Sequence, residues 1–152
     1  MKQWRVSEVM TRDVVTANED TTYEEIVDLL RRHRVSALPV VNHVGHVLGV
    51  VSETDLLRRL QDTGGARFGR RRRGQAKAGA RTARDLMTSP PVQVMPSATV
   101  EVAARRMLAA GVKRLPVEDY LRRLTGIVTR GDLLRATVDV RSPRDDAADH
   151  AA

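Results

Sequence analysis

The sequence has no cysteine, few aromatic residues and no long apolar run. Without cysteine, disulfides, thiolate metal sites and a cysteine nucleophile are excluded. Aromatic residues make up 3% of the 152 positions, so the core must be aliphatic and stacking platforms for single-stranded nucleic acid are scarce. No stretch approaches the roughly 18 apolar residues that a membrane-spanning helix needs, and no apolar leader opens the chain. We therefore expect a cytoplasmic protein without membrane contact.

The net positive charge of the chain comes from one segment of the sequence. The formal net charge is +7, and eight cations with no acidic residue lie between Thr63 and Arg84. Residues 63–81, rich in Gly and Arg, are therefore predicted to be a basic, mobile linker. A solvated tether is the simpler interpretation, and contact with phosphates or nucleic acid is the alternative. The polar residues 139–152 are predicted to form a disordered tail.

The chain contains an internal repeat. Residues 6–58 align without a gap with residues 83–135, at a constant offset of 77, with about fifteen identical positions. A unit of about fifty residues is marginally stable alone, so two copies in one chain are expected to complete each other's core. We expect repeat 1 over residues 1–62 and repeat 2 over residues 82–138. The longest shared motifs are Met10-Thr11 with Met87-Thr88, Leu38-Pro39-Val40 with Leu115-Pro116-Val117, and Asp55-Leu56-Leu57-Arg58 with Asp132-Leu133-Leu134-Arg135.

Each repeat is predicted to contain, in order, a helix turn, a strand, a helix, two strands and a helix. Thr22 and Glu25 have the spacing of a capping box, which predicts a helix start. In the second repeat we expect a helix from about residue 99 to 110, ended by Gly111. A turn at residues 42–45 predicts a hairpin. Arg122 occupies the position of Gly45, so we expect the second hairpin to turn differently.

A motif of glycine, two apolar residues, a hydroxyl, two variable residues and aspartate opens the last helix of each repeat. Ser52 precedes Asp55 in the first copy, and Thr129 precedes Asp132 in the second. This spacing is close to that of an N-terminal cap. A strand that enters a helix also presents free amides to a phosphate, and an aspartate one turn later can accept hydrogen bonds from ribose hydroxyls. The two interpretations are compatible.

No catalytic pattern is evident. The only histidines are His33, His43, His46 and His150. His43 and His46 flank one turn and no carboxylate pattern surrounds them at helical spacing, so we expect surface histidines and no metal site. The sequence has neither a Ser/His/Asp signature nor a Gly-x-x-x-x-Gly-Lys phosphate loop. We therefore expect a protein that is not an enzyme and has no cofactor.

These motifs, in this order and twice, resemble a tandem pair of cystathionine β-synthase (CBS) domains, the Bateman module. The resemblance covers about residues 6–136 and includes Val9-Met10-Thr11, Leu86-Met87-Thr88, the two Leu-Pro-Val motifs and the two Gly-to-Asp motifs. It implies an α+β fold of two β-α-β-β-α repeats with pseudo-twofold symmetry and two clefts. Members of this family bind AMP, ADP, ATP or S-adenosylmethionine and often form homodimers, so a regulatory, ligand-sensing homodimer is implied.

The resemblance also implies the residues of each cleft. Cleft A would contain Thr16, Ala17, Val35, Ser36, Ala37, Thr129 and Asp132. Cleft B would contain Val92, Val94, Val112, Lys113, Arg114, Ser52 and Asp55. Because Ser36-Ala37 is small and neutral whereas Lys113-Arg114 is long and charged, we expect the clefts to differ in affinity or in the ligand charge they prefer. The alternative function is a nucleic-acid-associated protein that uses the arginine linker. The sequence does not name the downstream protein partner.

Overall fold

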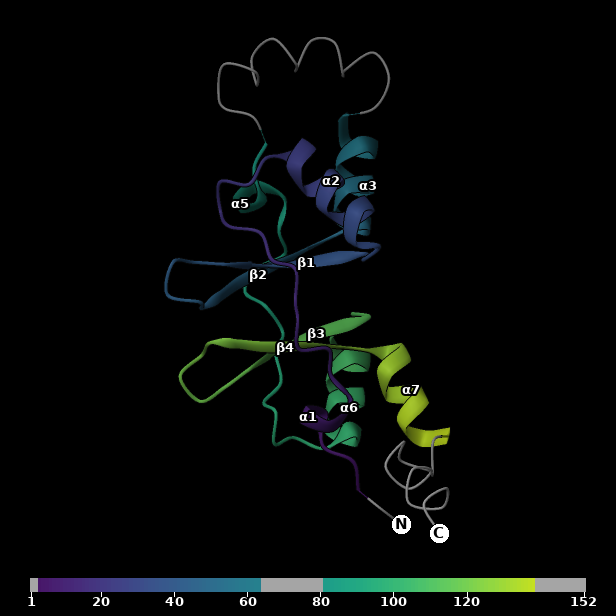
Figure 1. Ribbon diagram of the computed structural model, residues 1–152. Helices are drawn as coiled ribbons and strands as arrows, with labels where there is room; N and C mark the ends of the chain where they lie inside the picture. Colours follow the sequence, from purple (N-terminus) through teal and green to yellow (C-terminus); the bar gives the residue numbers. More distant parts are fainter. Residues whose placement is uncertain (1–2, 64–80, 139–152) are drawn as a thin grey trace. The chain divides into compact units, whose positions relative to one another are not determined.

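The computed structural model describes residues 3–63 and 81–138 and has a mixed α and β fold with short antiparallel sheets (Figure 1). Residues 64–80, which are all but the two end residues of the predicted linker 63–81, lie outside the described residues, and so does the predicted tail, residues 139–152. The hypothesis of nucleic-acid contact through the linker therefore also falls outside the described residues. The chain divides into two compact units. Unit 1 comprises Met1–Arg12, Val92–Val117 and Thr125–Ala152, and unit 2 comprises Asp13–Pro91 and Glu118–Leu124.

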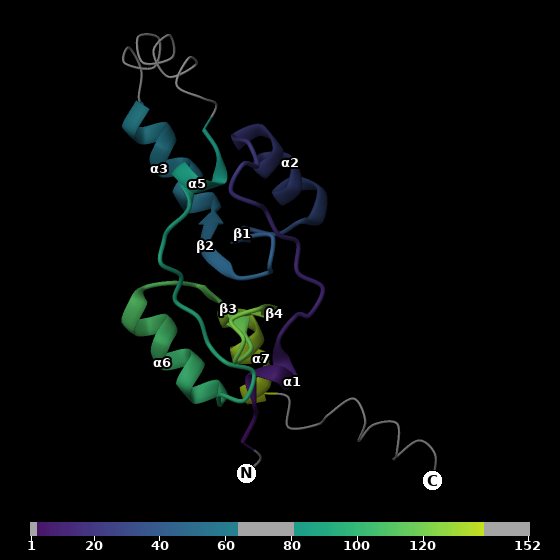
Figure 2. The ribbon, with the colours of Figure 1, turned by 90° about the vertical axis from the view of Figure 1, so that its left-hand side faces the viewer.

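Unit 2 contains most of the first repeat. Its elements are α2 (Tyr23–His33), β1 (Ala37–Val41), β2 (Val47–Ser52), α3 (Glu53–Thr63) and α5 (Ala83–Leu86). The strands β1 and β2 pair antiparallel, with Ala37 opposite Ser52 and an irregularity between Val40 and Val41. Figures 1 and 2 show α2 and α3 on the same side of this hairpin. The aliphatic core between them consists of Ala17, Ile26, Leu30, Leu38, Val40, Val51, Leu56, Ala83 and Leu86.

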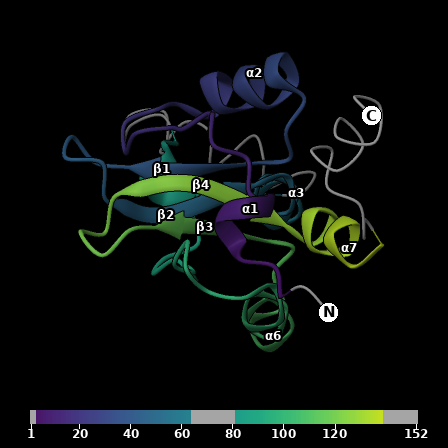
Figure 3. The same cartoon turned by 60° about the horizontal axis from the view of Figure 1, so that its bottom comes forward.

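Unit 1 contains most of the second repeat. Its elements are α1 (Val6–Val9), α6 (Val100–Ala110), β3 (Arg114–Glu118), β4 (Leu124–Thr129) and α7 (Arg130–Val138), except that Glu118 and Leu124, at the turn ends of the two strands, belong to unit 2. The helix α1 packs against α7 (Figure 3). The core of this unit is also aliphatic and consists of Val6, Val94, Val100, Ala103, Met107, Leu115, Val117, Val128, Leu133 and Ala136.

The helix ends follow the local sequence. Thr22 accepts a hydrogen bond from the Glu25 amide, and Glu25 accepts one from the Thr22 amide, so the predicted capping box is confirmed. Gly111 has φ +66° and ends α6 as predicted. The first strand of each repeat is reduced to one parallel bridge, between Ala17 and Val40 in unit 2 and between Val94 and Val117 in unit 1.

The two repeats exchange their opening segments. The segment with α1 packs on the second repeat, where the amide of Thr11 donates to the carbonyl of Ile127 and the amide of Ile127 donates back, both at 2.9 Å. The segment with α5 packs on the first repeat, where Val50 and Thr88 exchange the corresponding bonds at 3.1 and 2.9 Å. Each compact unit therefore includes the opening segment of the other repeat. The boundaries 1–62 and 82–138 stay predictions about the repeats in sequence.

The two shared glycines make this exchange possible. A Cβ on Gly49 would lie 2.7 Å from the Thr88 carbonyl oxygen, and a Cβ on Gly126 would lie 2.8 Å from that of Thr11. Both distances are too short for any side chain. The glycine of the Gly-to-Asp motif therefore lets a neighbouring backbone approach β2 or β4 closely.

The two hairpins turn in the same way, so the expectation of a different second turn was wrong. In the first hairpin, Asn42 Oδ1 accepts hydrogen bonds from the amides two and four residues ahead, and Asp119 Oδ1 does the same in the second. Gly45 has φ +87°, and Arg122 adopts φ +64° at the equivalent position. The turn tolerates this strain because the side chain of Asp119 fixes the surrounding backbone.

Within residues 3–63 and 81–138, the helices are too short and too polar to cross a membrane.

Candidate ligand-binding site

The junction of β2 and α3 in unit 2 closes on itself through hydrogen bonds. The Ser52 amide donates to Asp55 Oδ2 at 2.8 Å, and the Asp55 amide donates to Ser52 Oγ at 3.3 Å. The amide of Glu53 donates to the carbonyl of Ser36 at 2.9 Å, which ties the residue before β1 to the helix start. The hydroxyl of Thr88 donates to Asp55 Oδ1 at 3.1 Å. Ser36, Ser52 and Asp55 are thus brought together at one end of the hairpin.

The junction of β4 and α7 in unit 1 repeats this geometry. The Thr129 amide donates to Asp132 Oδ2 at 2.8 Å, and the Asp132 amide donates to Thr129 Oγ1 at 3.1 Å. The amide of Arg130 donates to the carbonyl of Lys113 at 2.9 Å. Arg135, one turn along α7, forms an ion pair with Asp132 Oδ1. This junction brings Lys113, Thr129 and Asp132 together within unit 1.

These bonds confirm the capping interpretation at both junctions. They also use amides that a phosphate would otherwise bind, because the first and third amides of α3 and of α7 donate within the protein. A phosphate at either helix start would depend more on hydroxyls and side-chain cations. Those cations are unequal, since Arg130 and the exposed Lys113 stand where the other repeat has Glu53 and Ser36.

The other predicted cleft residues lie along the edge of each hairpin. In unit 2, Thr16, Val35 and Ser36 are half-buried, whereas Ala17 and Ala37 are 3% and 5% exposed. In unit 1, the exposed or half-buried residues are Val92, Val112, Lys113 and Arg114, and Val94 is 1% exposed. The amide of Ala17 donates to the Pro39 carbonyl and that of Val94 donates to the Pro116 carbonyl. Ala17, Ala37 and Val94 therefore serve mainly to hold the backbone in position.

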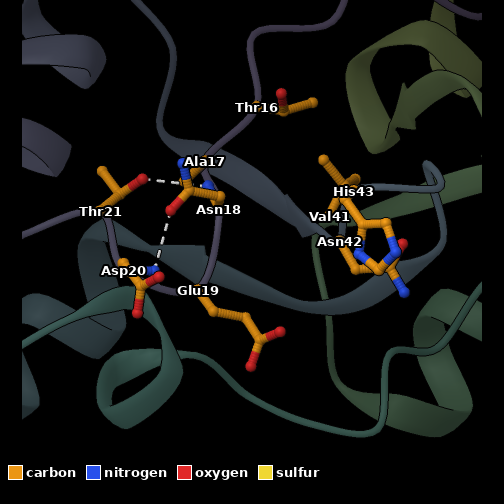
Figure 4. A pocket seen from close by; sticks show the side chains of 9 residues that line it. All are labelled: Thr16, Ala17, Asn18, Glu19, Asp20, Thr21, Val41, Asn42 and His43. Carbon is orange, nitrogen blue, oxygen red and sulfur yellow. Dashed lines mark hydrogen bonds between the residues drawn. The ribbon is translucent and has the colours of Figure 1, made fainter.

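A pocket of about 630 Å³ lies within unit 2 and includes two of the predicted residues, Thr16 and Ala17. Figure 4 shows the loop from Asn18 to Thr21 on one side of it and Asn42 and His43 on the other. Its volume falls in the range of small-molecule sites. Sequence reasoning missed this loop because its residues, Asn18, Glu19, Asp20 and Thr21, match no binding motif.

The polar groups of that loop are largely used to shape it. The Asn18 amide donates to Thr21 Oγ1 at 3.0 Å, and the Asp20 amide donates to Asn18 Oδ1 at 2.9 Å. Glu19 pairs with Arg84 at 2.9 Å, and this hydrogen bond and its charge raise the pKa of Arg84. The pairing also links the loop to α5, because Arg84 belongs to that helix.

No group of three or more His, Asp or Glu residues in the described part of the chain could hold a metal ion. His43 lines the pocket, and the backbone of His46 forms an isolated antiparallel β-bridge with that of Arg123.

Comparisons with known proteins agree with this geometry. The CBS domain model matches residues 6–62 and 83–139. The chloroplastic CBS domain-containing protein CBSX1 of Arabidopsis thaliana is 30% identical, over 93% of this chain and 67% of that protein. The uncharacterized protein MK0525 of Methanopyrus kandleri is 30% identical, over 89% of this chain and 63% of that protein. The chain thus spans about two thirds of the length of these relatives.

Among solved structures, the crystal structure of CBSX2 in complex with AMP has a TM-score of 0.77 and 32% identity, and the match covers 91% of this chain and 99% of that chain. CBSX2 is an Arabidopsis thaliana CBS-pair protein. The matched family model spans both repeats, and the hairpins, junctions and caps occur in both. The chain belongs to the CBS domain family and carries two CBS domains in tandem.

Proposed function

We propose that this chain is a regulatory module that binds an adenosine-containing ligand, and that AMP is the first candidate among AMP, ADP, ATP and S-adenosylmethionine. The observation that carries the proposal is the likeness to CBSX2, which was crystallised in complex with AMP and matches 91% of this chain at 32% identity. The module is not catalytic in this proposal. Its action in the cytoplasm stays a prediction from the sequence.

The chemistry of the two junctions supports this proposal. Asp55 and Asp132 each present a carboxylate at a helix start, where vicinal ribose hydroxyls can donate hydrogen bonds to it. Ser52 and Thr129 supply hydroxyls beside those carboxylates. The sequence assigns each ligand to a cleft that takes residues from both repeats, and this assignment stays a prediction. Regulation would follow if the ligand binds one conformation of the protein better than another.

Thermal unfolding with added nucleotides tests the proposal. At a ligand concentration of 100 times its dissociation constant, binding to the folded state alone stabilises it by about 2.7 kcal/mol. We expect AMP to raise the melting temperature and Asp55→Asn combined with Asp132→Asn to abolish the rise. Isothermal titration calorimetry gives the affinity and the number of sites.

Asp28→Asn is the matched control for that experiment. Asp28 is an exposed carboxylate on α2 that pairs with Arg32, so its loss should leave the ligand-induced rise intact. The proposal fails if none of the four ligands raises the melting temperature. It also fails for these junctions if the double variant responds to AMP as the wild-type protein does.

We also propose that the protein forms a homodimer through α3 and α7. Leu57 on α3 and Leu134 on α7 occupy equivalent positions and are 63% and 64% exposed. An apolar residue exposed at the same place in both repeats favours contact with a second copy of the chain, because a symmetric contact can use the same residue types twice. Light scattering should give a dimer mass for the wild-type protein and a monomer mass for Leu57→Glu with Leu134→Glu. Leu108→Glu, on the exposed face of α6, is the control that should leave the dimer intact.

A further inference from the structure

The two motif aspartates, Asp55 and Asp132, have equivalent backbone partners at Oδ2 and different partners at Oδ1. In each, Oδ2 accepts a hydrogen bond at 2.8 Å from the amide of the motif hydroxyl residue. The second oxygen of Asp55 accepts from the neutral hydroxyl of Thr88, whereas the second oxygen of Asp132 is paired with the cationic Arg135. Asp132 is 7% exposed and Asp55 is half-buried. Access to Asp132 is therefore restricted, and the partner of its Oδ1 atom is a positively charged guanidinium.

The arginines themselves do not explain this difference. Arg58 occupies in α3 the position that Arg135 has in α7, because both repeats read Asp-Leu-Leu-Arg. Within the described residues, Arg58 forms no ion pair with Asp55. Another residue must decide whether the arginine reaches the carboxylate three positions before it.

The residue before the aspartate provides the explanation. A Cβ on Gly131 would lie 3.7 Å from Arg135 Nη1 and 3.6 Å from Thr129 Oγ1. The first repeat has Thr54 at this position, and threonine carries two further heavy atoms on Cβ. A side chain of that size at position 131 would therefore adjoin the guanidinium of Arg135. Glycine carries no such side chain in α7, whereas α3 has the exposed Thr54 at the equivalent position.

We propose that Arg135 acts as an intramolecular competitor at Asp132, and that Gly131 admits it there. A ligand diol must displace the guanidinium before it can donate to Asp132, whereas Asp55 pairs with no cation among residues 3–63 and 81–138. We call each motif aspartate, together with its motif hydroxyl residue, a half-site. The inference rests on the proposed function and adds an order of occupation, in which the half-site at Asp55 binds ligand before the half-site at Asp132. The apparent affinity at Asp132 is reduced by the fraction of molecules in which the pair is closed.

The expected size of the effect follows from the exposure of the pair. The side chain of Arg135 is 72% exposed, so the ion pair is screened by solvent. Exposed pairs contribute up to about 1 kcal/mol, which corresponds to about a five-fold change in a dissociation constant. Arg135 is thus a positioning residue, and it needs a readout that a purely structural role would not alter.

Titration calorimetry with adenosine provides that readout, because adenosine carries the diol and no charge. Asp55→Asn isolates the half-site at Asp132. In this background we expect Arg135→Gln to tighten adenosine binding about five-fold. Gly131→Thr should act in the same direction while the arginine is retained, and Arg135→Lys should restore part of the weaker binding. Added salt should tighten adenosine binding when Arg135 is present and have no effect after Arg135→Gln.

The equivalent variants at the other half-site are the matched control. In the Asp132→Asn background, Arg58→Gln should leave adenosine affinity unchanged, and Thr54→Gly should weaken it by admitting Arg58. The inference is overturned if Arg135→Gln leaves adenosine binding unchanged, or if it weakens AMP binding only, which would make Arg135 a phosphate ligand. If the wild-type protein and all variants bind neither adenosine nor AMP, the proposed function itself fails.

Discussion

The two hairpin turns and the two helix starts of this protein respond differently to substitution. At the turns, Gly45 and Arg122 differ greatly, yet both adopt positive φ and the same hydrogen bonds surround them. At the helix starts, Thr54 and Gly131 differ by one small side chain, and the partner of the neighbouring aspartate changes from a hydroxyl to a guanidinium. Backbone geometry is thus preserved between the repeats, whereas the groups available to a ligand are not.

The physical reason lies in what holds each region in place. Each turn is fixed by hydrogen bonds to one side-chain oxygen, Asn42 Oδ1 or Asp119 Oδ1, so a single strained residue is tolerated. The Oδ1 atom of each motif aspartate has one partner within the described residues, so in our proposal a change of the preceding side chain is enough to change that partner. Differences between the repeats should therefore appear more strongly in ligand binding than in stability, except where backbones pack closely.

The largest expected effect tests the symmetry of the exchanged segments. In Gly126→Ala, the added Cβ would lie 2.6 Å from Met10 Sδ and 2.8 Å from the Thr11 carbonyl oxygen. We expect a loss of about 2 kcal/mol in the free energy of unfolding, because a backbone segment must move. Gly49→Ala, with the equivalent contacts to Met87 and Thr88, should cost a similar amount. Urea denaturation measures both values.

Gly131→Ala is the control for these variants. Its Cβ would make ordinary contacts at 3.6 and 3.7 Å, and alanine is favoured over glycine within a helix by about 1 kcal/mol. We expect unchanged or slightly increased stability. If Gly126→Ala were as stable as wild type while Gly49→Ala were not, the two exchanges would not be equivalent.

A smaller effect is expected at the hairpin turns. Arg122→Gly removes a non-glycine residue from the left-handed region, and we expect the free energy of unfolding to rise by about 1 kcal/mol. Gly45→Ala introduces such a residue into the first hairpin and should lower it by a similar amount. Thermal denaturation detects both changes. Equal stability of Arg122→Gly and wild type would mean that other contacts of Arg122 offset the strain.

The smallest effect concerns a buried carboxylate that only the second hairpin has. Glu118 is 5% exposed and stands at the position of Val41. Burial raises its pKa from the ordinary value of 4.5, against the charges of Arg122 and His46, which lower it, while Asp119 also raises it. The folded state therefore holds the proton more tightly than the unfolded state does. Stability is full below the unfolded pKa and is lost as pH rises through the folded pKa.

Glu118→Gln should remove this loss. We expect the variant to gain about 0.5 kcal/mol over wild type at neutral pH and less in acid, where wild-type Glu118 is protonated. Urea denaturation at two pH values measures the difference. Asp13→Asn, at an exposed position, should show no such dependence. A gain that is the same at both pH values would point to packing and not to the charge.

Local features of the fold could be predicted from the sequence. The cap at Thr22 and the helix end at Gly111 depend on residues within one turn, so their patterns are sufficient. The motif hydroxyls and aspartates were also identified correctly as a pair at each helix start. The turn at Arg122 was not predicted, because its conformation is imposed by the hydrogen bonds of Asp119. The loop from Asn18 to Thr21 carried no binding pattern.

The sequence by itself determined the duplication, the aliphatic cores and the elements of each repeat, because periodicity, caps and turns act over a few residues. The tertiary structure decided which copy each opening segment packs on, since Thr11 pairs with Ile127 and Thr88 with Val50 across long separations. It also decided that identical Asp-Leu-Leu-Arg motifs differ in charge pairing. In our proposal Arg135 reaches Asp132 because Gly131 has no side chain, and the closeness of Arg135 to Gly131 appears only when the side chains are placed in three dimensions.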